Sequence, residues 1–500
     1  MLNLHVVRFA CAALLAAGFG IAPLAAAPPN IVFILADDLA WSDVGFNGAE
    51  FFETPNIDRL ASQGMIFSQA YAGGPNCAPT RACLISGTYT PRHHIYTPGG
   101  RSKGDPRRMK LITPTLPSGF ERAGIAPWAP NFPSLRADST SAGDEGLDPS
   151  FVSLAELLEP AGYATGRFGK WHLGADDQGF GYSTLGAIDN GKGGYYDDPE
   201  ATQRLTTAAI GFMKQHRERP FFLYLPYWDV HTPLVATQDL VEKYEAKLKR
   251  VRPERPYKPV YAAMIEAVDT GVGRVLRALE ELGLENNTLV IFSSDNGGIE
   301  GNSFNAPLRG GKGSLYEGGI RVATCMRWPG VVKPGSETAT PITSVDFRPT
   351  FAELSGAKLP ASQPIDGASF VPLLKGERAL EDRAIYWHYP HYLDGNGPTN
   401  YMPLAGGTVG QGQGWRMTPA SAIREGDWKL IEFFEDGHVE LYDIPRDIGE
   451  KNDLAAAKPE IARRLHEKLK AWQKQVSAPV PSERNPHYDI SSRDRPRSGR

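Results

Sequence analysis

Three apolar runs rich in β-branched and aromatic residues constrain the fold of this chain most strongly. They are residues 31–35 (Ile-Val-Phe-Ile-Leu), 221–225 (Phe-Phe-Leu-Tyr-Leu) and 289–292 (Leu-Val-Ile-Phe), and helical patterns lie between them. Continuous apolar strands that alternate with helices are typical of parallel sheets covered on both faces. The sequence therefore predicts an α/β fold whose large, mostly parallel sheet is sandwiched by helices.

Polar groups follow these strands at their carboxyl ends. Asp37 and Asp38 come after the first run, Asp295 and Asn296 come after the third, and the second run leads to His231. In an open α/β sheet, ligands bind outside the carboxyl ends of the strands. We therefore expect these residues, which are far apart in the sequence, to meet in one crevice.

The two polar pairs also predict a metal site. Carboxylate and amide oxygens from two strand ends suit a divalent cation such as calcium, which accepts an irregular cage of oxygens. Magnesium demands a stricter geometry. Either pair alone would be interpreted as a turn or a helix cap, but two pairs at the same sheet edge favour a shared metal ion.

Residues 77–87 read Cys-Ala-Pro-Thr-Arg-Ala-Cys-Leu-Ile-Ser-Gly, a C-x-P-x-R run that opens a predicted helix. Backbone N–H groups at a helix start favour an anion, and Pro79 suits the first turn because its missing donor costs nothing there. The spacing to Arg81 is wrong for a thiol phosphatase loop. A disulfide between Cys77 and Cys83 also fits poorly, since the two side chains would not face each other on a helix.

Two further blocks carry cations that could bind an anion. In residues 169–174 (Gly-Lys-Trp-His-Leu-Gly), Lys170 and His172 fall on one side of an extended segment. Residues 309–321 are rich in glycine around Lys312, which lets the backbone approach a tetrahedral anion. Taken alone, each block would equally describe an ordinary loop with a solvated lysine.

Together and in this order, these motifs resemble those of the type I (formylglycine-dependent) sulfatases, arylsulfatase-like members of the alkaline phosphatase superfamily. The resemblance extends from about residue 30 to residue 375. The resemblance implies that a formylglycine maturation enzyme oxidises Cys77 and that the hydrated aldehyde is the nucleophile. It also implies one calcium ion, held by Asp37, Asp38, Asp295, Asn296 and an oxygen of the modified Cys77.

The same resemblance implies roles for the cations and histidines. Arg81, Lys170 and Lys312 would neutralise charge on the sulfuryl oxygens. We expect His231 to protonate the leaving alcohol, with Lys312 near enough to share that role, and His172 to deprotonate the second hydroxyl of the hydrate. The activity implied is hydrolysis of sulfate esters to an alcohol and inorganic sulfate.

The sequence departs from the family pattern at two places, of which the first is a tolerable swap and the second, with the inserted loop, bears on the substrate pocket. Thr80 stands where the family often has serine, and residues 179–181 read Gly-Phe-Gly where Gly-Phe-Asp is frequent. The aromatic run at residues 386–392 offers Trp387 and His388 as candidates to contact a sugar ring, although a buried strand would explain them equally well. With export, this run favours a sulfated carbohydrate over a small aryl sulfate as the substrate.

Other functions remain open. A phosphonate or phosphodiester hydrolase of the same superfamily would share the metal ligands and the C-x-P-x-R run. From a different class, an inactive glycan-binding protein could keep the fold and hold sulfated polymers through a basic loop. The complete set of candidate nucleophile, metal ligands and bases favours an enzyme.

The first residues resemble an export signal. An apolar stretch at 9–24 follows Arg8 and ends in three alanines before Pro28, so residues 1–27 are predicted to be cleaved. We expect an exported protein, periplasmic or secreted, without a stable membrane anchor; a retained anchor is the alternative. The remaining three cysteines are an odd number, which argues against a disulfide framework. A net charge of −4 gives no indication of a nucleic-acid partner.

The predicted organisation has two units after the signal segment. Residues 28–382 form the catalytic α/β domain, with an inserted loop at 97–149 that is either a lid or a solvated insertion. Residues 383–480 form a smaller antiparallel sheet closed by a helix. Residues 481–500 are polar and rich in arginine, and we expect a disordered tail there.

Overall fold

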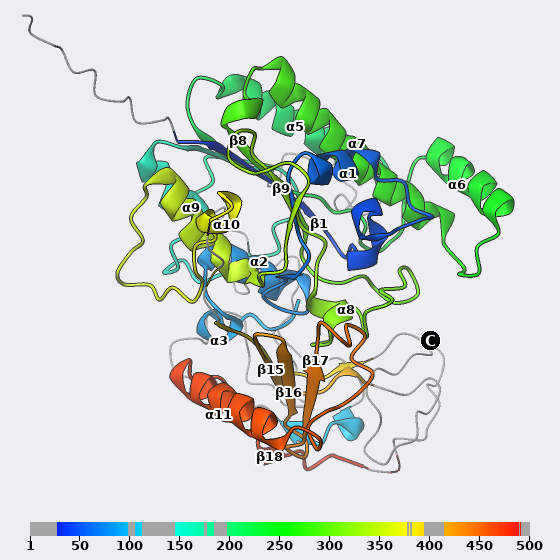
Figure 1. The fold of residues 1–500 in the computed structure, drawn as a ribbon, viewed down its shortest axis with the longest axis vertical. Coiled ribbons are helices and arrows are strands. Elements are labelled where there is room, and N and C mark those ends of the chain that lie inside the picture. Colours follow the sequence, from blue (N-terminus) through cyan, green and yellow to red (C-terminus); the bar gives the residue numbers. More distant parts are fainter. Residues whose placement is uncertain are drawn as a thin grey trace, which may run out of the picture.

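A central sheet of eight strands forms the core of the molecule (Figure 1). The computed structural model describes residues 28–98, 106–112, 146–174, 178–184, 198–377, 380, 383–394, 415–489 and 491, so the predicted signal segment lies outside it. The strand order is β10 (Ser336–Thr338), β2 (Met65–Phe67), β9 (Cys325–Arg327), β8 (Thr288–Ser294), β1 (Asn30–Ala36), β7 (Phe221–Pro226), β5 (Ala164–Arg167) and β6 (Tyr182–Ser183).

The predicted fold class is confirmed. Strand β1 pairs in parallel with β7 and with β8, and all seven of its residues are buried. Only β9 breaks the parallel pattern, since it runs antiparallel to both β2 and β8. Each fully buried aliphatic or aromatic side chain contributes about 1.5–3 kcal/mol to stability, so these central strands dominate the core.

Helices cover both faces of this sheet because alternate residues of a strand point to opposite sides. Val32 and Ile34 pack with one set of helices, and Ile31 and Phe33 pack with the other. The first set comprises α1 (Pro55–Ser62), α5 (Ala201–Gln215) and α7 (Pro259–Glu281), with α6 (Gln238–Val251) packed on α7. The second set comprises α2 (Cys77–Ser86), α4 (Leu154–Leu158), α9 (Phe347–Ser355) and α10 (Val371–Leu374).

A smaller antiparallel sheet lies below the first in Figure 1 and is covered by the last long helix. Apolar residues of that helix, among them Leu465 and Leu469, are buried against the sheet, as their spacing predicts. Its members are β12 (Ala384–Tyr389), β15 (Ala420–Glu425), β16 (Trp428–Phe433), β17 (Val439–Asp443) and α11 (Pro459–Gln475). The short helices α3 (Thr90–His93) and α8 (Glu317–Ile320) lie between the two sheets.

Three short strand pairs complete the described structure. They are β3 (Ala70–Tyr71) with β11 (Ile342–Thr343), β13 (Leu393–Asp394) with β14 (Trp415–Met417), and β4 (Leu111–Ile112) with β18 (Glu483–Arg484). The last pair shows that the predicted disordered tail is wrong over its first part. Asn485 N–H also donates to the Lys110 carbonyl at 2.9 Å, so backbone pairing orders a segment whose polar side chains gave no such signal.

Most of the predicted insertion at 97–149 lies outside the described residues, and the boundaries predicted for the two units remain proposals. Within the described part of the chain, no helix is both long and apolar enough to cross a bilayer.

Candidate functional site

The candidate metal ligands lie at the carboxyl ends of β1 and β8. Because these strands are parallel neighbours with Ala36 opposite Ser294, the residues that follow them come together. The Asp38 N–H donates to Oδ1 of Asp295 at 3.2 Å. All four candidates, Asp37, Asp38, Asp295 and Asn296, are at most 1 % exposed. Asp38 also has a positive φ of 64°, a strained backbone conformation of the kind that clusters at functional sites.

Two oxygens of this group lack a donor. Oδ1 of Asp37 and Oδ1 of Asn296 are buried and accept no hydrogen bond from the described residues. The Asn296 amide donates through Nδ2 to Oδ1 of Asp38 at 2.7 Å, which fixes the orientation of its oxygen. Buried oxygens without partners cost about 1–3 kcal/mol each. A hard cation would supply the missing partner, so these residues fit a metal ion.

Three cations surround the carboxylates. Lys312 Nζ lies 2.6 Å from Oδ1 of Asp38, Lys170 Nζ pairs with Asp37, and the Arg81 guanidinium donates to Asp295 at 2.7 and 3.0 Å. Each predicted cation therefore forms an ion pair with a predicted metal ligand: Arg81 with Asp295, Lys170 with Asp37, and Lys312 with Asp38.

The charges of the site are strongly coupled. Burial acts to raise the pKa of Asp37, but the charges of Lys170, His231 and Arg81 together outweigh it and hold that pKa below its ordinary value. Burial and the neighbouring Asp37 carboxylate raise the pKa of Asp295. Burial opposes the charge of Lys312, yet Asp38 raises its pKa above the ordinary value, so the lysine stays protonated. The result is a compact array of fixed charges.

Cys77 is the first residue of α2, with Asn76 as the N-cap. Its Sγ lies with carboxylate oxygens of Asp37 and Asp295 in a group whose atoms are all within 4.8 Å of one another. Burial raises the pKa of the Cys77 thiol, despite the nearby lysines. An unmodified thiol here would stay protonated and would be a poor nucleophile. The cysteines at 77, 83 and 325 are all free and buried.

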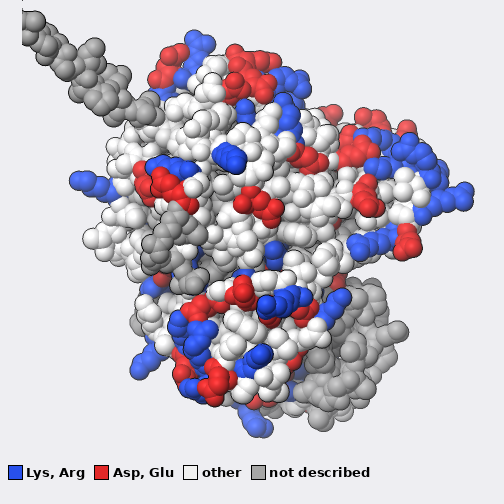
Figure 2. All heavy atoms as spheres, viewed as in Figure 1, with Lys and Arg blue, Asp and Glu red and all other residues white. Residues whose placement is uncertain are grey.

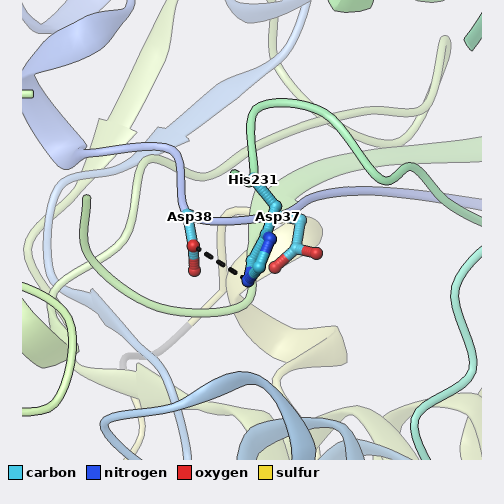
Figure 3. A group of neighbouring side chains, drawn as sticks. All are labelled: Asp37, Asp38 and His231. Atoms are coloured by element: carbon cyan, nitrogen blue, oxygen red, sulfur yellow. Dashed lines mark ion pairs between the residues drawn. The ribbon is translucent and has the colours of Figure 1, made fainter. Parts of the chain in front are cut away.

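His231 lies between the two aspartates that follow β1, Asp37 and Asp38 (Figure 3). Its Nε2 is 3.6 Å from Oδ2 of Asp38, and Asp37, Asp38 and His231 form a second group of potential ligand atoms. Its Nδ1 is 2.5 Å from the Thr232 carbonyl. Because a carbonyl only accepts, Nδ1 carries a proton and Nε2 is the nitrogen that can exchange one.

His172 follows β5 in an irregular segment and has a positive φ of 65°. The pKa of His172 lies well below its ordinary value, through dense protein surroundings and then the cations of Lys170 and Arg81. Because the side chain of His172 is exposed, we attribute the lowered pKa mainly to the positive charges of Lys170 and Arg81. His172 is therefore neutral near pH 7 and able to accept a proton.

Trp387 and His388 do not join this site. Both lie on β12 and are 1 % exposed. The Trp387 indole donates to the Ala72 carbonyl at 2.7 Å, and His388 Nδ1 is 2.7 Å from Oγ of Ser421. Burial lowers the pKa of His388 to about 3. The suggestion that they contact a sugar is corrected: in the structure they are packing residues, because residues 387–389 of β12 are all buried.

Ser294, which was not among the predicted site residues, braces the two ligand loops. Its hydroxyl donates to the Asn296 carbonyl at 3.0 Å and accepts the Leu39 N–H at 3.2 Å. Arg416 was also missed; its Nη1 donates to the Lys312 carbonyl at 3.2 Å. A hydroxyl next to Asp295 was a usable signal for Ser294, whereas Arg416 lies on β14, far away in the sequence, and carried none.

Comparisons with known proteins agree with one another. The family model described as Sulfatase matches residues 29–357. A Sulfatase of Formosa agariphila is 32 % identical, with 90 % of each chain covered. The N-acetylgalactosamine-6-sulfatase of Mus musculus is 32 % identical over 72 % of this chain and 69 % of its own. The solved structure of Ps i-CgsB with k-i-k-neocarrahexaose has a TM-score of 0.67 and 27 % identity, covering 93 % and 96 %.

Proposed function

The chain belongs to the sulfatase family and is a sulfuric ester hydrolase, and on that premise we propose that it removes sulfate from sulfated carbohydrates by means of Cys77. One observation carries the proposal. The first residue of α2 meets the carboxylates that follow β1 and β8, in a buried array of three cations. A helix start amid fixed positive charge suits a sulfuryl group.

Converted to formylglycine, Cys77 would supply a hydrated aldehyde whose hydroxyl attacks sulfur. This conversion would solve the problem of a buried thiol whose pKa is raised, and it needs a maturation enzyme as a partner. Asp37, Asp38, Asp295 and Asn296 would hold one calcium ion, which would draw charge from the sulfuryl oxygens when bound. The unpartnered oxygens of Asp37 and Asn296 support that assignment.

The remaining residues of the site have separable roles. Arg81, Lys170 and Lys312 hold positive charge around the sulfuryl oxygens, and their carboxylate partners keep them in place. His231 exchanges a proton at Nε2 with the leaving alcohol, because its Nδ1 is committed to the Thr232 carbonyl. His172, as a neutral imidazole, accepts a proton from the nucleophile to release sulfate.

The substrate class rests on the relatives. Two of them are an N-acetylgalactosamine-6-sulfatase and a protein whose structure was solved in complex with k-i-k-neocarrahexaose. By similarity we propose a sulfated sugar for this chain rather than a small aryl sulfate. We also propose that the protein is exported, periplasmic or secreted, through its first 27 residues.

The test is release of inorganic sulfate by the purified protein, measured by ion chromatography. The panel contains N-acetylgalactosamine 6-sulfate, glucosamine 6-sulfate, carrageenan oligosaccharides, 4-nitrophenyl sulfate and a matched phosphonate ester. We expect the highest kcat/KM on a sulfated sugar, loss of activity in EDTA and its return with calcium. Cys77→Ala should lower kcat by at least about 10⁴-fold, as removal of a nucleophile does.

Lys451→Met, at an exposed lysine of the second unit, is the matched control and should keep full activity. Faster turnover of the phosphonate ester than of every sulfate ester would contradict the proposed substrate class. Undiminished turnover by Cys77→Ala would contradict the proposed nucleophile.

A further inference from the structure

A group of exposed cations lies where α6 ends and the link to α7 begins. Lys249, Arg250, Arg252 and Arg255 are all exposed, and Glu254 is the one acid among them. We call these four cations the α6 basic surface. Figure 2 shows Lys and Arg side chains gathered on the lobe that α6 forms at the right of the molecule. The chain as a whole has a net charge of −4, so this local excess of positive charge differs from the average of the molecule.

Three of the four cations of this surface form no ion pair within the described part of the chain. Earlier on α6, Lys243 bridges Glu53 and Glu266, and Lys247 pairs with Glu53. By contrast, Lys249, Arg250 and Arg252 form no ion pair with any residue that the structure describes. Their charge therefore stays available to a partner.

Helix stabilisation explains only part of this surface. Cations in the last turn of a helix interact favourably with its dipole, typically by about 0.3–1 kcal/mol, which accounts for Lys249 and Arg250. Arg252 is already the C-cap, with a left-handed backbone at φ 48°, and Arg255 lies beyond the helix. The run of cations continues where the dipole gives it no advantage.

The surface adjoins the loop that joins two parts of the site. The Arg255 guanidinium lies over the Phe304 ring at 5.5 Å, and Lys258, at the same link, donates to Asn302 at 2.7 Å. Both contacts fall on the loop between Asn296 and Lys312. That loop is tied back to the site, since the Lys312 N–H donates to the Gly298 carbonyl at 3.0 Å.

We propose that the α6 basic surface binds the chain of a sulfated polysaccharide outside the sugar that is hydrolysed. This inference rests on the proposed function and extends it to the form of the substrate. A polymer with repeated sulfate groups presents negative charge at several points, so it can occupy the site and this surface together. The positive field also raises the rate at which such a polymer is captured.

An anionic membrane is the other partner that cations could serve, and the packing argues against it. Membrane-surface helices need an apolar face that enters the lipid. On α6 the apolar side chains Leu240, Val241, Tyr244 and Leu248 already pack against the main core. Val251 is the one large apolar side chain of α6 that is exposed, and a single valine does not make the apolar face that a bilayer needs.

The test compares two triple variants of the full-length protein by their binding to dextran sulfate in biolayer interferometry. Lys249→Gln/Arg250→Gln/Arg252→Gln removes three cations of the surface. Lys214→Gln/Arg217→Gln/Arg219→Gln removes three exposed cations near the end of α5, at the amino edge of β7 and opposite the site. In 0.15 M salt, the first variant should weaken dextran sulfate binding about tenfold and the second less than about twofold.

Turnover of 4-nitrophenyl sulfate is the second readout and should be the same for both variants and the wild type. If the wild type hydrolyses no sulfate ester, the proposed function fails while the binding comparison still stands. Equal losses of dextran sulfate binding in both variants, or no loss in either, would overturn the inference. So would cation-dependent binding to phosphatidylserine vesicles that is as strong as binding to dextran sulfate.

Discussion

Two buried charge clusters share the glycine-rich segment at residues 309–321 and differ in how their oxygens are satisfied. The site cluster contains Lys312 and the carboxylates that follow β1 and β8. The second cluster contains Glu317, only a few residues further along the chain, and lies against the antiparallel sheet. We call it the Lys429 cluster; its members are Glu317, Arg321, Lys429 and Glu450.

Every carboxylate oxygen of the Lys429 cluster has a donor. Lys429 Nζ lies 3.0 Å from Oε1 of Glu317 and 2.8 Å from Oε1 of Glu450. Oε2 of Glu317 accepts from Arg321 at 3.1 Å and from the Tyr71 hydroxyl at 2.9 Å. Oε2 of Glu450 accepts the Glu317 N–H at 2.6 Å. This cluster is complete with protein groups alone.

The site cluster is incomplete in the same sense, because oxygens of Asp37 and Asn296 have no donor. Both clusters bury charge, which costs free energy unless each group is paired. The Lys429 cluster is therefore satisfied by protein groups, whereas the site cluster has oxygens that suit a ligand. The Lys429 cluster joins β16 to α8, whose Gly319 carbonyl in turn accepts the Gly297 N–H at 3.0 Å. It therefore holds the second sheet against the backbone next to Asn296.

The largest expected effect is a loss of stability when the Lys429 cluster is disrupted. Lys429→Met leaves Glu317 and Glu450 buried with their shared cation removed, so the free energy of unfolding should fall by about 3–5 kcal/mol. The urea midpoint at pH 7 measures this change. Lys451→Met removes an exposed lysine nearby and should change stability by less than about 0.5 kcal/mol. Equal urea midpoints for the two variants would contradict the proposal that the Lys429 cluster stabilises the fold.

A smaller effect on stability is expected at the site cluster, through calcium binding. Calcium that binds only the folded protein should raise the free energy of unfolding by about 3 kcal/mol at a hundred times its Kd. Asp37→Asn should lose most of this increment, because it removes a ligand charge. Lys429→Met should keep it, although its starting stability is lower. Urea unfolding with and without calcium measures both; an increment that survives in Asp37→Asn would contradict the metal assignment.

Much of the fold could be predicted because it depends on apolar pattern. The continuous runs that became β1, β7 and β8 are buried on both faces, which is the arrangement that such runs indicate. The meeting of Asp37 with Asp295 followed from the parallel register alone. The alternating strands of the second sheet and the apolar stripe of α11 could also be predicted from the sequence.

The rest depends on contacts between distant segments, which pattern does not carry. Lys429 stands in an alternating strand and reads as a solvent-facing residue, yet it is fully buried because Glu317 and Glu450 meet it from other parts of the chain. The sequence left open whether Trp387 contacts a sugar or belongs to the core, and only its burial and its hydrogen bond to the Ala72 carbonyl decided. Strand β18 is ordered by backbone hydrogen bonds to β4, which cannot be predicted from its side chains.

The central claim is that Cys77 is converted to the nucleophile of a sulfatase. The most direct measurement is the mass of the tryptic peptide that ends at Arg81, taken from protein purified out of its native host. The account predicts the mass of an aldehyde at position 77, in place of the buried thiol. A peptide that carries only the unmodified thiol, at full occupancy, would contradict the account and leave a thiol-based reaction or a binding role.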